Sequence, residues 1–226
     1  MKQFSWIFLI LSIVLATCQS QPKVITEGTI TYAIDYPNHK DNFFLYSILP
    51  KSMDVRFKNG HVESIIQKAN LTNALFVDCN KKQFAAYFEY GDEAFRVKLN
   101  ETDIQTMLNN QKRYRIQLLP NRDTLAGFNV KKALAIAVNN PEDVIELWYT
   151  NEVKIKNSNW YNPYYKVPGF LLAYSIDRYG IRMEFKAKRL DETKLKESQL
   201  KLPKNGTEIV YSEYNERLSD LFKSFE

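Results

Sequence analysis

Residues 143–190 constrain the fold more than any other part of the chain, because their apolar side chains recur at strand spacing. In residues 181–189, every second position is apolar and the positions between them are charged. Successive strand residues point to opposite faces, so this run predicts a strand with one buried and one solvated face. The strand-like runs 144–150 and 169–176 precede it, and a short turn separates the last two. The segment therefore predicts antiparallel strands in hairpin order. The apolar positions are Ile181, Met183, Phe185 and Ala187, and the charged ones are Arg182, Glu184, Lys186 and Lys188.

The same alternation recurs along the rest of the chain. Asn59-Gly60 lies between two alternating runs and predicts a hairpin, because both residues accept positive φ. Residues 101–110 carry Ile104, Met107 and Leu108 at helical spacing and predict a short helix capped by Asn100 or Thr102. A second helix is expected over residues 212–225. Further strands are expected at residues 29–36, 52–58, 61–69, 73–78, 83–90, 93–99, 114–119 and 128–138.

These elements together predict a mainly β fold of the β-rich α+β class. We expect a single large curved antiparallel sheet, or half-barrel, of about ten or eleven strands, with a short middle helix and a C-terminal helix. A sheet of this size has to curl or close. No linker or repeat divides the chain, so residues 27–226 are expected to form a single domain.

The first 18 residues have the pattern of an export signal. Lys2 precedes an apolar run at 4–16, which as a helix is roughly 20 Å long against roughly 30 Å of bilayer hydrocarbon. The run ends Leu15-Ala16-Thr17-Cys18, which resembles a bacterial lipobox in which the Cys receives lipid, although Thr17 departs from the usual small residue. Two outcomes remain open. One is an outer-membrane lipoprotein that faces the periplasm, anchored through Cys18 with residues 19–26 as a tether. The other is ordinary cleavage to a secreted or periplasmic soluble protein.

Composition and motifs exclude several classes of function. The formal charge of +5 is spread along the chain without a clustered basic face, so we expect no nucleic-acid partner. Cys79 would have no disulfide partner in the mature chain, and no His stands near it in sequence to make it a nucleophile. His39 and His61 both sit beside turns, and a zinc site usually needs several ligands at close spacing. We therefore predict no metal, no cofactor and no catalytic residues, and the protein is not expected to be an enzyme.

Two aromatic-rich loops are the candidate binding segments. Residues 39–47 are expected to be an unusually apolar loop, and residues 154–167 a polar, aromatic one. Amphipathic aromatics at a strand end can contact a ligand or a membrane surface. The alternative is that both loops pack against the sheet as a cap or plug. The candidate ligand- or partner-binding residues are Phe43, Phe44, Tyr46, Trp148, Trp160, Tyr161, Tyr164 and Tyr165.

Several segments resemble a group of exported lipoproteins and secreted proteins of Bacteroidota, which form domain-of-unknown-function families near the GLPGLI group. The segments are residues 27–37 (EGTITYAIDYP), 49–53 (LPKSM), 125–133 (LAGFNVKKA), 148–150 (WYT) and 169–172 (GFLL). The resemblance covers about residues 27–190. It departs at Asn129-Val130-Lys131, where relatives often carry a Cys. The resemblance implies a LolA-like architecture, an antiparallel half-barrel with helices over its open side and an apolar cavity for acyl chains.

Two hypotheses follow. The first is an envelope lipoprotein that acts as a non-catalytic binding module, with a lipid or acyl chain held in such a cavity. The second is a structural or interaction protein of the envelope, with a filled core, no small-molecule ligand and another envelope protein as its partner. The space between the sheet and the helices distinguishes them, because an open apolar cavity favours carriage and a solid core favours a scaffold.

Overall fold

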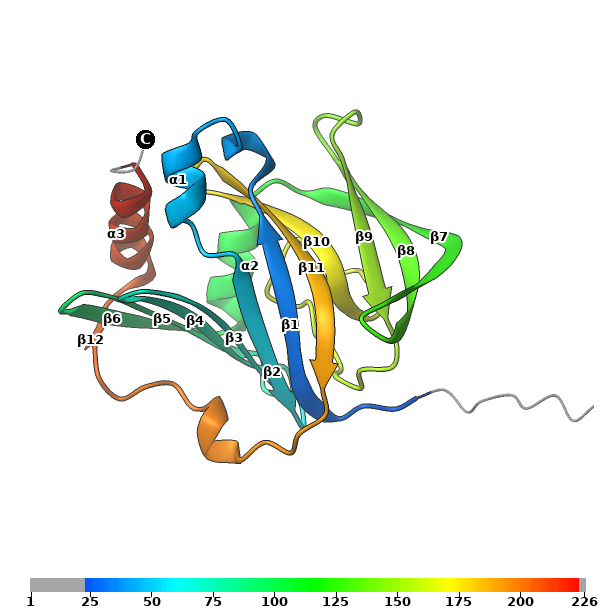
Figure 1. Ribbon diagram of the computed structural model, residues 1–226, viewed down its shortest axis with the longest axis horizontal. Coiled ribbons are helices and arrows are strands. Elements are labelled where there is room, and N and C mark those ends of the chain that lie inside the picture. Colours follow the sequence, from blue (N-terminus) through cyan, green and yellow to red (C-terminus); the bar gives the residue numbers. More distant parts are fainter. Residues whose placement is uncertain (1–22, 224–226) are drawn as a thin grey trace, which may run out of the picture.

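The computed structural model describes residues 23–223, in which twelve strands form one sheet (Figure 1). The order across the sheet is β12-β6-β5-β4-β3-β2-β1-β11-β10-β9-β8-β7. The strands are β1 (Glu27–Asp35), β2 (Ser52–Lys58), β3 (His61–Lys68), β4 (Leu71–Asp78), β5 (Gln83–Tyr90), β6 (Glu93–Leu99), β7 (Tyr114–Leu125), β8 (Phe128–Ala137), β9 (Val144–Thr150), β10 (Phe170–Arg178), β11 (Ile181–Asp191) and β12 (Thr207–Glu208).

The sheet is curved and open, as Figure 1 shows, with β7 and β12 at its two edges. Neighbouring strands are antiparallel except β12, which runs parallel to β6. β1 pairs with β2 on one side and with β11 on the other, so the first strand joins the two halves of the sheet. The predicted fold class, a mainly β protein built on a single curved antiparallel sheet, is confirmed.

Three α-helices accompany the sheet: α1 (Phe43–Ile48), α2 (Glu101–Asn109) and α3 (Tyr211–Lys223), with 3-10 turns at η1 (Pro37–His39) and η2 (Glu197–Leu200). The predicted middle and C-terminal helices are confirmed. α2 begins with a capping box in which Asn100 and Asp103 each accept a hydrogen bond from the other's backbone N–H, at 3.0 and 2.9 Å. Among residues 23–223, no helix has the length and apolar character required to cross a bilayer.

The prediction of a loop at residues 39–47 was wrong, because α1 occupies Phe43–Ile48. The apolar run has no polar face from which helical spacing could be recognised. The side chain of Asn42 caps the helix by accepting a hydrogen bond from the Leu45 N–H at 3.0 Å, and Leu45 is buried in the core. A local cap and one tertiary contact therefore decide the conformation.

The prediction that a strand ends at residue 119 was also wrong, because β7 continues through Pro120 to Leu125. β7 is an edge strand, where a residue without an N–H is tolerated, and its register with β8 shifts between Leu118 and Arg122. The predicted hairpin at Asn59-Gly60 is confirmed, since it joins β2 to β3 and the two residues have φ of 50° and 87°.

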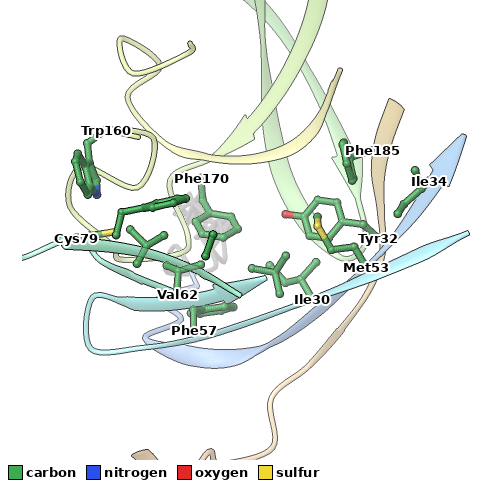
Figure 2. Close-up of a cluster of buried hydrophobic side chains, with 14 of the residues drawn as sticks. Ile30, Tyr32, Ile34, Met53, Phe57, Val62, Cys79, Trp160, Phe170 and Phe185 are labelled. Carbon is green, nitrogen blue, oxygen red and sulfur yellow. The ribbon is translucent and has the colours of Figure 1, made fainter. Parts of the chain in front are cut away.

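The inner face of the sheet, which we define as the face that carries Ile30, Tyr32 and Ile34 of β1, holds the main core. Figure 2 shows these three residues together with Met53, Phe57 and Val62 of the neighbouring strands, opposite Phe170 and Trp160. All eight are buried. This part of the interior is filled by side chains.

A second buried cluster lies on β8, β9 and β10. In the second half of β8 the buried positions are Ala133, Ala135 and Ala137, whereas Leu134 and Ile136 on the opposite face stay half-exposed. The small alanines face the same cluster as the bulky ring of Tyr164, which the long β9–β10 connection brings in. The alternation in the sequence separates the two faces of β8. The presence of the bulky Tyr164 ring explains why the alanine face is the buried one.

Candidate functional site

Burial on the inner face decreases from one end of β3 and β4 to the other. Val62 and Val77 form the first inward-facing pair and are buried. The next inward positions along the two strands are Ser64, which pairs with Leu75, and then Ile66, which pairs with Asn73, and all four are partly exposed. These four side chains point to the same face as the buried core but keep part of their surface accessible to solvent.

The facing part of the sheet shows the same gradient. On β10, Phe170 and Leu172 are buried, whereas Tyr174 and Ile176, farther along the strand, are partly exposed. Tyr174 nevertheless lies in the interior, with its ring stacked on Phe185 of β11 at 4.9 Å between centroids. We call this partly exposed part of the inner face the recess, and its residues are Ser64, Ile66, Asn73, Leu75, Tyr174 and Ile176.

The long connection between β9 and β10 closes one end of the recess. Trp160 is buried, and the ring of Tyr161 lies 5.7 Å from Phe84 of β5 and 6.2 Å from Trp160. The side-chain amide of Asn159 holds the connection in place by donating to the carbonyls of Val167 and Gly169, at 3.1 and 2.8 Å.

Gly169 allows the connection to rejoin the sheet. A Cβ at this position would lie 2.4 Å from the carbonyl oxygen of Thr150, which is closer than real Cβ atoms approach. A larger residue would therefore push the start of β10 away from β9. The closed end of the recess depends on this contact as well as on the aromatic rings.

The other end of the recess lies beside α1. The ammonium group of Lys68, at the end of β3, donates to the carbonyls of Ser47 and Leu49, the latter at 3.1 Å, which places the end of α1 there. Phe43 and Phe44, on the first turn of α1, are 83% and 71% exposed. Two adjacent aromatic side chains with this exposure are uncommon on a protein surface that has no partner.

Tyr46 has a structural position on α1. Its hydroxyl donates to Asp35 at 2.9 Å, and the ammonium of Lys51 lies 2.9 Å from the centre of its ring. Burial lowers the pKa of Lys51, and the ring contact compensates part of the lost hydration. Tyr46 is thus half-buried and held on two sides.

Four neutral polar side chains face the recess without an intramolecular partner. The side chains of Ser64, Asn73, Tyr161 and Tyr174 make no hydrogen bond within residues 23–223. Tyr32, by contrast, donates to the carbonyl of Leu171 at 2.7 Å. Burial raises the pKa of Tyr161 and Tyr174 well above the ordinary value of a phenol, and their proximity to each other raises the pKa of Tyr161 further. An apolar surface with a few converging polar groups is the usual composition of a small-molecule site.

The candidate residues predicted from the sequence have separate locations. Tyr161 lies at the closed end of the recess with Trp160 behind it, and Phe43 and Phe44 lie at the open end. Tyr164 is buried in the second cluster, where its hydroxyl donates to the carbonyl of Ser175. Of the remaining three, Tyr46 is half-buried on α1 and Tyr165 is 54% exposed. The indole N–H of Trp148 donates to exposed Glu146 at 2.6 Å.

Sequence reasoning missed the recess residues on β3, β4 and β10. A signal was present, since Ser64 interrupts the apolar positions Val62 and Ile66, and Asn73 interrupts Leu71 and Leu75. A polar residue at an inward position of an alternating strand indicates either a buried hydrogen bond or a place that solvent or a ligand can reach.

Other polar features of the described chain lie outside the recess. A solvent-open depression of about 610 Å³ at the β4–β5 turn is lined by His61, Asp78, Lys81 and the start of α2. Burial raises the pKa of the Cys79 thiol to about 12, so it is a poor nucleophile. Within the part of the chain that the structure describes, no three His, Cys, Asp or Glu side chains gather as a metal site would require. Cys18, the predicted lipidation site, lies outside the described residues.

Comparison with known proteins gives similarity in fold. No protein-family model and no curated protein matches the chain. A solved structure of PNGF-II in space group C2 matches with a TM-score of 0.55 and 18% identity, over 88% of this chain and 33% of that one. The P21 form matches with a TM-score of 0.55 and 19% identity, over 85% and 33%. A beta-barrel-like protein of a domain of unknown function from Brucella abortus matches with a TM-score of 0.32 and 10% identity, over 75% and 98%, which does not establish a common fold. The chain therefore spans about a third of the length of PNGF-II and shares the fold of that part.

Proposed function

We propose that the protein is a non-catalytic binding module of the cell envelope that holds an apolar or amphipathic ligand, such as a lipid or acyl chain, in the recess. The observation that carries the proposal is the partial exposure of inward-facing Ile66, Leu75 and Ile176 on the same face as the buried core. Apolar side chains that face an unfilled interior favour an apolar occupant, because covering them removes their surface from water.

The direction of the chain is compatible with a membrane anchor at Cys18. β1 begins after the expected tether and runs toward η1 and α1, at the open end of the recess (Figure 1). Its nine residues span about 30 Å at 3.3 Å per residue. A protein anchored through Cys18 would therefore present the open end of the recess on the side away from the anchor. Labelling with palmitate in the wild type and in Cys18→Ala tests the anchor.

The binding proposal is tested by native mass spectrometry of the purified protein with envelope lipids and by titration with Nile red, a neutral hydrophobic dye. We expect a retained hydrophobe and saturable dye binding. Leu75→Trp, which fills the recess from β4, is expected to reduce both. Thr72→Trp is the matched control, because Thr72 lies on the same strand with its side chain on the opposite face. If the wild type binds neither dye nor lipid, the proposal is wrong.

A second candidate, a protein-interaction module, is favoured by the exposure of Phe43 and Phe44. In that case Phe43→Ser/Phe44→Ser would abolish recovery of a cross-linked envelope protein without a change in stability. Substitutions at Trp160 and Tyr164 are unsuitable for this test, because both side chains are buried and their loss would unfold the protein.

A further inference from the structure

We infer that the ligand is an uncharged amphiphile whose polar headgroup lies inside the recess. This inference rests on the proposed binding function and specifies its ligand.

The polar groups that face the recess are neutral and can both donate and accept hydrogen bonds. Ser64, Tyr161 and Tyr174 present hydroxyls, and Asn73 presents an amide. These groups have no partner within the described chain, so a ligand that brings only hydrocarbon would leave them unpaired. A ligand with hydroxyl or ester groups would satisfy them.

In the part of the chain that the structure describes, three cationic side chains lie at the open end of the recess. The ammonium of Lys51 lies over the rings of Tyr36 and Tyr46 and has no hydrogen-bond partner among the described residues. Lys68 donates to the two carbonyls at the end of α1. Arg178, the last inward-facing residue of β10, donates to the hydroxyl of Tyr211 at 3.0 Å. A carboxylate placed beside Ser64 and Tyr174 would have no such counter-charge, and burial of an unpaired ion is costly.

An anionic lipid would bind in the opposite orientation, with its head at Lys51, Lys68 or Arg178 and its tail inside. The tail would then lie against the four neutral polar groups and leave them without hydrogen bonds. For two ligands with the same acyl chain, the first orientation predicts tighter binding of the uncharged ligand and the second predicts tighter binding of the anionic one.

Displacement of Nile red by monolaurin and by laurate at pH 8 distinguishes these orientations, because both carry the lauroyl chain. We expect monolaurin to bind about tenfold more tightly, since each lost hydrogen bond or unpaired charge weakens binding by roughly an order of magnitude. In Tyr161→Phe/Tyr174→Phe, the ratio of the monolaurin affinity to the laurate affinity should fall about tenfold. Tyr165→Phe, at an exposed position of the same connection, is the control and should leave both affinities unchanged.

The outcomes separate this inference from the proposal on which it rests. If Nile red binds but laurate competes as well as monolaurin, or the double variant keeps the affinity ratio of the wild type, the neutral-headgroup inference is overturned and the binding module stands. If neither dye nor amphiphile binds, both are overturned.

Discussion

Enlarging a side chain distinguishes an open recess from a filled core. Ser64 lies on the inner face at a partly exposed position and makes no side-chain hydrogen bond. Ala135 lies in the second cluster and has no exposed surface. We compare Ser64→Leu with Ala135→Leu, since both introduce leucine at an inward position of a strand.

The two substitutions are expected to differ in free energy of unfolding by about 1–3 kcal/mol. Ala135→Leu adds three carbons to a closed cluster that includes the rings of Tyr149 and Tyr164, and overpacking of this kind costs about 1–3 kcal/mol. For a protein of this size that corresponds to a decrease in Tm of roughly 2–12 °C. Ser64→Leu removes no hydrogen bond and extends into open space, so its stability should stay within about 0.5 kcal/mol of the wild type.

Urea denaturation followed by circular dichroism measures the free energy of unfolding of both variants. Nile red titration of the same samples measures dye binding in the recess. We expect Ser64→Leu to be stable but to bind less dye, and Ala135→Leu to bind dye normally while it remains folded. If both substitutions destabilise by the same amount, the interior near Ser64 is filled and the reasoning from partial exposure is refuted.

Three further predictions concern stability. Tyr164→Phe removes a buried donor to the Ser175 carbonyl and should lower the free energy of unfolding by about 1–2 kcal/mol in urea denaturation, whereas Tyr165→Phe at an exposed position should have no effect. Burial raises the pKa of Cys79 in the folded state from 9.0 to about 12, so the thiol contributes fully to stability below pH 9 and loses this contribution as the pH rises toward 12. In urea denaturation, the free energy of unfolding of Cys79→Ala should therefore fall less steeply over this pH range than that of the wild type. Equal slopes would contradict the burial argument. Asn100→Ala removes the N-cap of α2 and should cost about 1 kcal/mol by thermal unfolding, and Thr102→Ala, one residue inside the helix, should cost measurably less.

Much of the fold could be predicted because its determinants are local. The alternation in residues 181–189 depends only on the period of a strand, and the Asn59-Gly60 turn depends only on two residues that accept positive φ. The helix α2 was predictable because its cap and its apolar positions lie within ten residues. α1 was not, because its apolar run has no polar face and its end depends on contacts with Lys68 of β3.

The candidate site was less predictable than the fold. The aromatic loop at 154–167 was identified from the sequence. Its side chains lie at the closed end of the recess, in the second cluster or in solvent, and no local pattern predicts which of these environments each one occupies. The recess residues on β3 and β10 are distant in sequence and approach only because β1 pairs with both β2 and β11.

Periodicity and capping act over a few residues, so the amino-acid sequence was enough to predict most strands and the two longer helices. The extent of burial along the inner face follows from tertiary packing. The burial of each inward-facing residue depends on which distant side chains pack against it. Trp160 and Tyr161 pack at one end, and at the other end Ile66 and Ile176 stay partly exposed within the described chain.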